Sequence, residues 1–413
     1  MKDSKSIFIS RSFYPIEGGI QTFLLEVCKR YGKNKTIVFT KSEKDIESEI
    51  SNPVKIKRFD WRNRSYFNSL LILLKLLLKS RFSIVKHFFL TLMLMGTRSA
   101  AIEISDFTRN VYLYLKRERI FPKEIHASVP IYSGVIGLIL KYLFSSKLIV
   151  YIHGSELLTM KRKNITLIQD WVFKNSDLII ANSNYTKNLA VQLGVNKKKI
   201  EVVNLGANTS TFFPTNNLGQ LREKYDISSN HKILYTISHL IPRKGNDMVL
   251  KALPKVLERF PNITYLIGGH GRYKAELDKI INDLNLSKNV KFTGFIDNSE
   301  LNSHMNLCDI FIMPNRREGN DIEGYGIVFM EANACRKPVI GGNSGGVPDA
   351  IIDNYNGLLV NPRSSNDISN KIIKLLSNER KARLIGDNGY NLIIKERNWD
   401  IVSQKIIEVI KRK

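Results

Sequence analysis

The chain has 413 residues, 43% of them hydrophobic, with 63 basic and 38 acidic side chains that give a formal net charge of +25. This length suits two domains of about 200 residues, and the apolar content excludes a disordered protein. Three cysteines without a metal-ligand spacing argue against a disulfide framework and for a reducing compartment. The charge requires an anionic partner, either nucleic acid or an anionic membrane surface.

The first predicted elements are a strand at 7–9 and a helix at 21–31, joined by a loop that contains Gly18 and Gly19. In an α/β unit such glycines let the backbone approach a phosphate or a substrate, although a plain turn also explains a glycine pair. The start of the chain lacks an apolar segment long enough for a signal peptide, which predicts a cytoplasmic protein.

A strand at 36–40 is followed by a basic stretch at 55–98, in which ten Lys and Arg residues face only Asp60. Its apolar runs, 70–78 and 88–95, are shorter than the roughly 18 residues that span a bilayer. The stretch is therefore predicted to lie in the interface of an anionic membrane, with a buried helix at 70–78 as the alternative. No helix-turn-helix, zinc-finger or RNA-recognition motif accompanies the charge, so we expect no nucleic-acid partner.

Further strands are predicted at 125–128, 148–152, 178–183 and 200–206, and in the second half at 233–238, 265–269, 290–295 and 308–314. This order predicts an α/β protein with domains at 1–207 and 231–398, a linker at 208–230 and a closing helix at 399–413 that packs on the first domain. His153 directly follows the strand at 148–152, where open α/β sheets place their ligands. A structural histidine is the alternative.

Two carboxylates eight residues apart, Glu323 and Glu331, flank the turn that leads into a helix-forming run from Ile327. Gly324 and Gly326 permit a sharp turn between them. A fully helical segment would separate the acids by about 12 Å, too far to share one proton or metal ion. They can instead grip two ends of a polyhydroxylated ligand while the helix amides attract a diphosphate, as a nucleotide sugar requires. The alternative is a solvated helix face.

Three further segments follow the second glutamate: Glu331-Ala332-Asn333-Ala334, Lys337-Pro338-Val339-Ile340 and Gly345-Gly346-Val347-Pro348-Asp349-Ala350. The whole passage resembles the signature of the GT-B glycosyltransferases of family 4. Within it, Asp321-Ile322-Glu323-Gly324-Tyr325-Gly326 is most similar to the branch that includes the phosphatidylinositol mannosyltransferases. This resemblance implies two Rossmann-like doubly wound domains that face an interdomain cleft. It also implies a retaining transfer of a mannose- or glucose-type hexosyl group from a nucleotide-diphosphate sugar. The implied acceptor is lipid-linked or a polysaccharide, in cell-envelope glycan biosynthesis. The implied location is peripheral, on the inner face of the cytoplasmic membrane.

The resemblance also implies roles for individual residues. Lys244 would neutralise the donor diphosphate, Glu323 and His153 would contact the sugar, and Glu331 would bind the ribose. The donor-binding residues implied in this way are Gly18, Gly19, His239, Arg243, Lys244, Gly268, Gly269, Phe295, Glu323, Gly324, Tyr325, Gly326, Ile327 and Glu331. No Asp-x-Asp metal pair is present, so no metal or cofactor is expected.

Two residues depart from the family pattern. His239 stands where the family has an arginine. Stabilisation of the leaving group would then depend on Lys244, with Arg243 as a substitute for the missing arginine. Arg336 stands where a glycine is customary, and it either strains that turn or adds a charge. The alternatives to glycosyl transfer are a basic, non-catalytic protein that binds nucleic acid or a membrane surface, and a nucleotide-sugar epimerase, for which the sequence reveals no acid/base set.

Overall fold

The computed structural model describes residues 5–16, 18–32, 35–42, 54–59, 98–158, 163–216, 218 and 220–413. The chain folds into two compact units. Unit 1 contains Met1–Asn182, Thr186–Val203 and Ser403–Lys413, and unit 2 contains Ser183–Tyr185 and Asn204–Val402.

Within the described residues, unit 1 holds a seven-stranded parallel sheet in the order β3-β2-β1-β4-β5-β6-β7. Its strands are β1 (Ser6–Ile9), β2 (Thr36–Lys41), β3 (Lys55–Phe59), β4 (Glu124–Ala127), β5 (Lys147–Ile152), β6 (Leu178–Ala181) and β7 (Ile200–Val202). The helices that accompany it are α1 (Gly19–Tyr31), α4 (Arg98–Arg117), α5 (Tyr132–Phe144), α6 (Ser155–Leu158), α7 (Lys163–Asn175), α8 (Asn184–Gln192) and the short 3₁₀ helix η1 (Lys197–Lys199).

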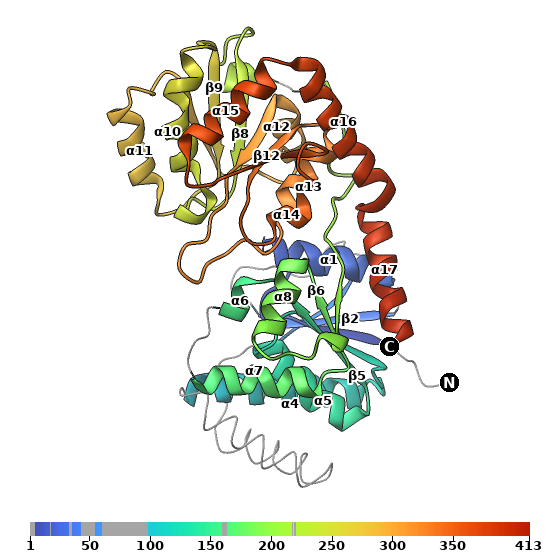
Figure 1. Ribbon diagram of the computed structural model, residues 1–413. Helices are drawn as coiled ribbons and strands as arrows, with labels where there is room; N and C mark the ends of the chain where they lie inside the picture. The colour runs from blue at the N-terminus through green and yellow to red at the C-terminus, as the bar shows by residue number, and fades with distance from the viewer. Residues whose placement is uncertain are drawn as a thin grey trace. The chain divides into compact units, whose positions relative to one another are not determined.

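Unit 2 is built on a six-stranded parallel sheet in the order β10-β9-β8-β11-β12-β13, counted over the part of the chain that the structure describes (Figure 1). Its strands are β8 (Lys232–Ile237), β9 (Ile263–Gly268), β10 (Val290–Gly294), β11 (Ile310–Met313), β12 (Val339–Gly342) and β13 (Gly357–Val360). Its helices are α9 (Leu221–Lys224), η2 (Pro242–Lys244), α10 (Asn246–Leu257), α11 (Lys274–Asp283), α12 (Leu301–Leu307), α13 (Ile327–Ala334), α14 (Val347–Ala350), α15 (Ser365–Leu376) and α16 (Glu379–Glu396).

Helix α17 (Trp399–Arg412) begins in unit 2, and its residues from Ser403 onward belong to unit 1. At its end, Lys413 Nζ lies 3.2 Å from Glu201 Oε1 and donates a hydrogen bond to the carbonyl of Lys198. Both partners are residues of unit 1. The last turn of the chain therefore packs beside η1 and β7.

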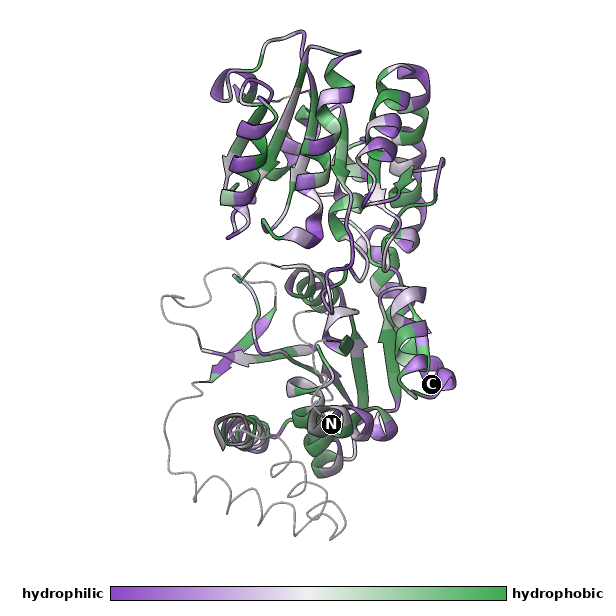
Figure 2. Ribbon diagram, turned by 60° about the vertical axis from the view of Figure 1, so that its left-hand side comes forward, coloured by the Kyte–Doolittle hydropathy of each residue, from purple (hydrophilic) through white to green (hydrophobic). Residues whose placement is uncertain are grey.

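Most strands away from the sheet edges are short apolar runs buried on both faces, as parallel sheets require. β5 and β9 show this most clearly, since every residue of β9 and the last five of β5 are buried. Figure 2 shows the strands mostly in the hydrophobic colour, whereas the helices carry hydrophilic outer sides. The core of unit 2 joins α10 and α15 to the sheet through Leu253, Ile312 and Ile372. The prediction of two Rossmann-like parallel α/β sheets is confirmed.

One prediction needs correction at the start of the basic stretch. Lys55–Phe59 forms strand β3, paired in parallel with β2, and not the beginning of an interfacial helix. Ile56 is buried between exposed Lys55 and half-buried Lys57, so the alternation of a strand was present in the sequence and was obscured by the charges. The rest of the predicted interfacial segment, 60–97, lies outside the described residues. Among the residues that are described, no helix is both long enough and apolar enough to cross a bilayer.

Candidate functional site

The order of the strands in unit 2 indicates where a ligand binds. The chain builds β8, β9 and β10 toward one edge of the sheet and then crosses to β11 on the other side of β8. Open α/β sheets bind ligands outside the carboxyl ends of the two strands between which the order reverses. These strands are β8 and β11, so the loops that follow them are the expected binding loops.

The two loops are held in direct contact by a glycine. Gly245 follows η2 with φ +77°, and a Cβ at this position would come within 2.3 Å of the carbonyl oxygen of Pro314, just after β11. Only glycine fits both the backbone angle and the space. The amide of Arg316 also donates a hydrogen bond of 2.9 Å to the carbonyl of Arg243. The loops after β8 and β11 thus form one structural unit.

A cluster of charged side chains lies between these loops. Oε2 of Glu323 accepts hydrogen bonds from Arg243 Nη1 at 2.5 Å, Lys244 Nζ at 2.7 Å and Asn315 Nδ2 at 3.0 Å. Arg243 Nε lies 2.9 Å from Oδ1 of Asp321, so two cations face two carboxylates. The Arg243, Lys244 and Glu323 side chains are only 14–16% exposed. Oε1 of Glu323 has no hydrogen-bond partner among the described residues and is free to accept one from a ligand.

The electrostatics of this cluster follow from burial and pairing. Burial alone would raise the pKa of Glu323, but the charges of Lys244 and Arg243 lower it to about 2, so the carboxylate is ionised at neutral pH. Burial lowers the pKa of Lys244, because desolvation outweighs its attraction to Glu323. For Arg243 the neighbouring carboxylates outweigh burial, and its pKa is raised. A buried lysine beside a fixed guanidinium is suited to receive a multiply charged anion.

Glu331 lies on α13, the helix that begins directly after the site loop. Gly326 precedes the helix with φ +90°, and no side chain caps its first turn. The first amides of such a helix have no intrahelical acceptor. Glu331 forms no hydrogen bond or ion pair within the described part of the chain, and burial raises its pKa to about 7. This carboxyl group is thus unpaired and close to its titration point at neutral pH.

The glycine pair after β12 explains how the Glu323 loop is held. A Cβ at Gly345 would lie 2.4 Å from the Glu323 carbonyl, and one at Gly346 would lie 1.8 Å from the Gly324 carbonyl. The amide of Gly346 donates to the Glu323 carbonyl at 2.9 Å. Backbone therefore packs on backbone here, and the glycines help to fix the position of Glu323.

Among the sequence-predicted residues, Tyr325 has its side chain turned away from the site, and Gly268 and Gly269 have a packing role. Tyr325 is 1% exposed, and its hydroxyl accepts a hydrogen bond from Arg397 at 3.0 Å. Only its backbone can contact a ligand. The amide of Gly269 already donates to the Gly294 carbonyl, and a Cβ there would lie 2.0 Å from the carbonyl of Ser238. Gly268 is also buried, so this pair allows β8 and β9 to end close together. Ile327, the first residue of α13, is half-buried.

Three aromatic rings follow the neighbouring strands β8, β9 and β10. His239 and His270 are exposed, with ring centroids 5.5 Å apart at nearly a right angle. The His270 ring lies 6.4 Å from that of Phe295, which is 60% exposed. An exposed row of rings at the carboxyl edge of a sheet suits a flat ligand group such as a base. Within the described residues, His239 forms no hydrogen bond or ion pair with Glu323, whereas Arg243 forms both.

Unit 1 has its own reversal of strand order, between β1 and β4. Gly18 and Gly19 follow β1, and a Cβ at Gly19 would meet nothing within 4 Å. His153 follows β5, and its Nε2 lies 3.0 Å from the carbonyl of Ser128, which follows β4. A carbonyl only accepts, so Nε2 carries the proton and Nδ1 is the acceptor. Burial lowers the pKa of His153, which keeps the ring neutral.

The sequence analysis missed three residues of the site: Asn315, Asp321 and His270. Asn315 is fully buried yet follows a strand end, which is a usable signal for a side chain held in a site. Asp321 was interpreted only as part of the loop that contains Glu323, whereas it pairs with Arg243. Within the described residues no group of three or more His, Cys, Asp or Glu side chains is placed to hold a metal ion.

Comparison with known proteins identifies two matching families. The model described as "Glycosyl transferases group 1" matches residues 219–411, and the one described as "Glycosyltransferase Family 4" matches 105–211. A GDP-mannose-dependent alpha-(1-6)-phosphatidylinositol monomannoside mannosyltransferase from Mycobacterium tuberculosis is 31% identical over 274 residues, which cover 65% of this chain and 70% of the relative. A GDP-mannose-dependent monoacylated alpha-(1-6)-phosphatidylinositol monomannoside mannosyltransferase from Corynebacterium glutamicum is 30% identical over 274 residues, covering 64% of this chain and 70% of the relative.

Solved structures match over nearly the whole chain. The crystal structure of Anabaena HepE in complex with UDP and glucose superposes with a TM-score of 0.77 at 20% identity, covering 99% of this chain and 100% of that one. Sucrose-phosphate synthase from Thermosynechococcus elongatus superposes with a TM-score of 0.77 at 19% identity, covering 99% and 98%. At this level of identity the likeness concerns the fold.

Proposed function

The chain belongs to the group 1 glycosyltransferases of family 4, with the GT-B fold, and on this premise we propose that it transfers a mannose- or glucose-type hexosyl group from a nucleotide-diphosphate sugar to a hydroxyl of a lipid-linked or polysaccharide acceptor. That it is a glycosyltransferase using a nucleotide sugar follows from its family. The sugar, the acceptor and the residue roles are our proposal. The observation that carries it is the cluster of Lys244, Arg243, Asn315 and Glu323 between β8 and β11.

The reaction breaks the bond between the anomeric carbon and the diphosphate. Positive charge develops on the sugar and negative charge on the departing diphosphate, so cations fixed beside the diphosphate lower the barrier. Lys244 and Arg243 supply these cations, together with the uncapped amides at the start of α13. In this proposal they take the place of a divalent ion, and activity should survive a chelator such as EDTA. Loss of activity in EDTA that Mg²⁺ restores would contradict this role.

The remaining polar groups orient the donor. Oε1 of Glu323 accepts from a sugar hydroxyl while Oε2 keeps its three donors. Glu331 accepts from the ribose hydroxyls, and Nδ1 of His153 accepts from a hydroxyl of the sugar. The exposed rings of His239, His270 and Phe295 flank the base. Arg243 fills the electrostatic role that an arginine at position 239 has in the family.

We propose that the anomeric configuration is retained without a covalent sugar–enzyme intermediate. We assign no protein nucleophile: Glu323 is ionised but engaged by three donors, and its assigned role is to orient the sugar. The acceptor hydroxyl then attacks on the face that the diphosphate leaves. Proton NMR of the first product formed checks this, since an inverted anomeric signal would refute it.

The donor can be identified by a binding screen. The purified protein is heated with GDP-, UDP-, ADP- and dTDP-sugars, and hydrolysis of each is followed, with Glu331→Ala in parallel. GDP-mannose is the first candidate because it is named for the mycobacterial and corynebacterial relatives, and UDP-glucose is the second because HepE was crystallised with UDP and glucose. We expect one nucleotide to stabilise the wild type and not the variant. Absence of stabilisation by all four nucleotides would contradict the proposal.

A lipid-linked acceptor is supported by the basic surface of unit 1. Around Tyr114 lie Lys55, Lys57 and Arg117, with charged groups 5.6–6.0 Å from the ring centroid. Tyr114 is itself buried, and the cations around it, of which Lys55 and Arg117 are exposed, suit an anionic lipid surface. Changing these three cations to Glu should release the protein from anionic vesicles, while unchanged binding would count against a membrane partner. Nothing within the described residues favours a non-catalytic binding protein or an epimerase over glycosyl transfer.

A further inference from the structure

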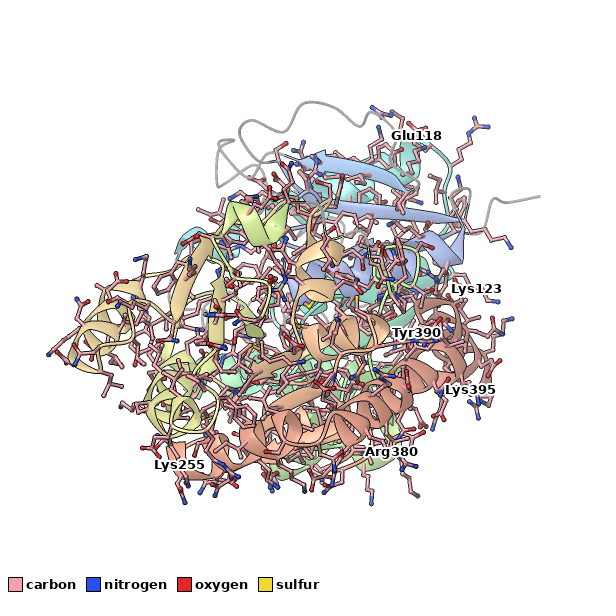
Figure 3. The ribbon with its side chains drawn as sticks, turned by 90° about the horizontal axis from the view of Figure 1, so that it is seen from above. Glu118, Lys123, Lys255, Arg380, Tyr390 and Lys395 are labelled. Atoms are coloured by element: carbon pink, nitrogen blue, oxygen red, sulfur yellow. The ribbon has the colours of Figure 1, made fainter. Side chains whose placement is uncertain are left out.

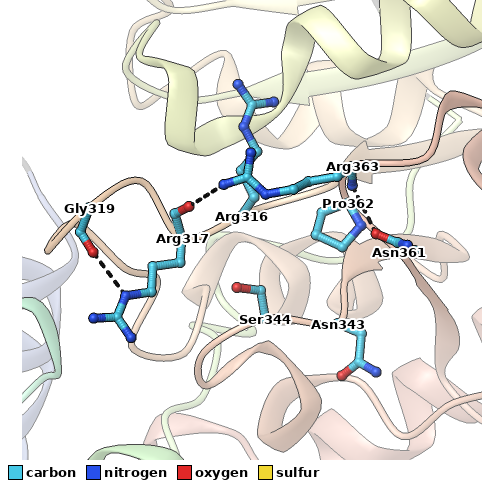
Figure 4. A pocket seen from close by; sticks show the side chains of 8 residues that line it. All are labelled: Arg316, Arg317, Gly319, Asn343, Ser344, Asn361, Pro362 and Arg363. Carbon is cyan, nitrogen blue, oxygen red and sulfur yellow. Dashed lines mark hydrogen bonds between the residues drawn. The ribbon is translucent and has the colours of Figure 1, made fainter.

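A separate cavity of about 340 Å³ opens at the carboxyl ends of β11, β12 and β13 (Figure 4). We call it the arginine pocket. It is lined by Arg316, Arg317, Gly319, Asn343, Ser344, Asn361, Pro362 and Arg363. None of these residues belongs to the Lys244–Glu323 cluster or to the aromatic row. The pocket is therefore a concave site at the ligand-binding edge of the sheet that the proposed donor site does not use.

The three arginines have different electrostatic environments. Arg316 is 7% exposed, and it forms ion pairs with Asp247 at 2.7 Å and Glu318 at 2.5 Å. These two carboxylates compensate the charge of Arg316, and its side chain forms the floor of the pocket. Arg317 is exposed, and its Nε donates to the Gly319 carbonyl at 2.8 Å. No carboxylate among the described residues pairs with it.

Arg363 is the third arginine, and its side chain is 63% exposed. Its Nη2 donates to the carbonyl of Arg317 at 2.7 Å and lies 3.5 Å from Oε1 of Glu318. Glu318 already pairs more closely with Arg316, so it offsets Arg363 only weakly. Arg317 and Arg363 thus retain N–H groups without acceptors among the described residues, and together they carry an excess of positive charge.

Neutral donors complete the lining. The amide of Asn343 is bonded to the carbonyl of Val360, which fixes the backbone, but the side chains of Asn343 and Ser344 have no hydrogen-bond partner in the described part of the chain. Figure 4 shows the Ser344 side chain nearer to the arginines, whereas the side-chain amide of Asn343 points away from them. The guanidinium groups together with the Ser344 hydroxyl offer donors from several directions. Such an arrangement suits a tetrahedral oxyanion better than a planar carboxylate.

We propose that the arginine pocket binds a phosphate group of a ligand other than the donor nucleotide, through Arg317, Arg363 and Ser344. Phosphate offers several acceptor oxygens, and arginine matches them with paired N–H groups. The proposal goes beyond the proposed function, because the donor diphosphate is assigned to Lys244 and Arg243. It holds or fails independently of which sugar is transferred.

The two sites share one structural element. Glu318 and Asp321 exchange two backbone hydrogen bonds, of 3.0 and 2.9 Å, around Gly319. Asp321 pairs with Arg243 of the donor cluster, and Glu318 pairs with Arg316 of the pocket floor. This tight turn lies between the two sites and contributes one ion pair to each of them. A phosphate in the pocket therefore lies beside the donor site without occupying it.

The test is calorimetric titration of the full-length protein with inorganic phosphate. The variant carries Arg317→Gln and Arg363→Gln, two changes of exposed side chains that leave the buried Arg316 in place. The control is Arg380→Gln, an exposed arginine of α16 whose side chain points outward in Figure 3. We expect the double variant to bind phosphate at least tenfold more weakly, and the control to match the wild type. Equal binding by wild type and double variant would overturn the proposal.

A second titration separates the pocket from the donor site. Phosphate binding is measured again with GDP or UDP at saturation. We expect it to persist, and loss of phosphate binding under saturating nucleotide would mean that phosphate occupies the donor site, which overturns the proposal. The single change Arg317→Gln repeats the test if the double variant is unstable.

Vesicles distinguish two sources of the phosphate group. Binding to phosphatidylglycerol vesicles is compared with binding to neutral phosphatidylcholine vesicles. If the double variant loses both phosphate and phosphatidylglycerol binding, the pocket takes a lipid headgroup. If it loses only inorganic phosphate binding, the pocket takes a soluble phosphorylated ligand. Either result supports the proposal, and a variant unchanged in both assays refutes it.

Discussion

The ammonium group of Lys244 lies 2.7 Å from Oε2 of Glu323, although 79 residues separate the two in the chain. They meet because β8 and β11 are neighbours in the sheet, and each residue belongs to the loop that follows its strand. Both side chains are largely buried, so each is held in place by the other and by Arg243. In the proposed reaction one member of this pair faces the diphosphate and the other faces the sugar.

Replacing Lys244 by Met should lower kcat at least 100-fold, because the departing diphosphate loses a preorganised cation that matters most in the transition state. Arg243 still pairs with Glu323, so we expect the variant to fold. Initial rates with the identified donor measure the effect. Lys274→Met, an exposed lysine of α11, is the matched control. A kcat within threefold of the wild type would remove Lys244 from the mechanism.

Replacing Glu331 by Gln should stabilise the free protein at alkaline pH and leave it unchanged in acid. Burial raises the pKa of this carboxyl to about 7, so folding disfavours its ionised form. The resulting cost in stability appears as pH rises above the usual carboxyl pKa and is complete above about pH 7, where it reaches up to about 3 kcal/mol. Thermal unfolding at pH 5 and pH 8 measures it. Equal shifts in melting temperature at both pH values would contradict the assignment.

The same carboxyl should make nucleotide binding pH-dependent. Ribose hydroxyls donate to a carboxylate, so binding favours the ionised Glu331 and affinity should rise several-fold between pH 5.5 and pH 7.5. Titration of the matching nucleoside diphosphate across this range checks the prediction. In Glu331→Gln the rise should disappear, whereas Glu276→Gln, at an exposed position on α11, should retain it.

Gly19→Val should lower activity without lowering stability. A Cβ at position 19 meets nothing within 4 Å, so a larger side chain enters open space and costs the fold little. If that space is where the donor or acceptor lies, the KM of one of them should rise at least tenfold. Melting temperature and steady-state kinetics are measured together. Full activity in the valine variant would show that the glycine only makes a turn.

Tyr325→Phe should lower stability without lowering activity. It deletes the hydroxyl that accepts from Arg397, at a cost of about 1 kcal/mol in unfolding free energy. Arg397 keeps its bonds to the carbonyls of Asp349 and Ala350, so the loss should remain moderate. Kinetic constants should match the wild type, because the ring does not reach the site. A raised donor KM would mean that Tyr325 affects binding.

Much of the fold could be predicted because buried parallel strands are short apolar runs between turn residues. The runs ending before His153 and before Pro314 are examples, and both are strands. Lys55–Phe59 could not be recognised in the same way, because it is an edge strand with three of its five residues charged. Pairing with β2 decides its structure, and pairing is a contact with a distant part of the chain.

The candidate site was only partly predictable for a related reason. Sequence spacing and resemblance select Glu323 and Lys244, but they cannot show that one carboxylate oxygen takes three donors while the other stays free. The position of Tyr325 in the motif predicted a ligand contact. In the structure its side chain is buried, and its hydroxyl accepts a hydrogen bond from Arg397. Arg336 was informative, since it has φ +57°, the left-handed conformation that a glycine would adopt without strain.

The close contact of Gly245 with Pro314 divides the binding region into two parts that can change independently. The charged residues sit on loops that are in backbone contact, and any side chain at position 245 would push these loops apart. The rings of His239, His270 and Phe295 sit on solvent-exposed loop positions. If these rings flank the base as we propose, evolution or a randomised library can alter base preference at these three positions while the chemistry of bond cleavage is inherited unchanged.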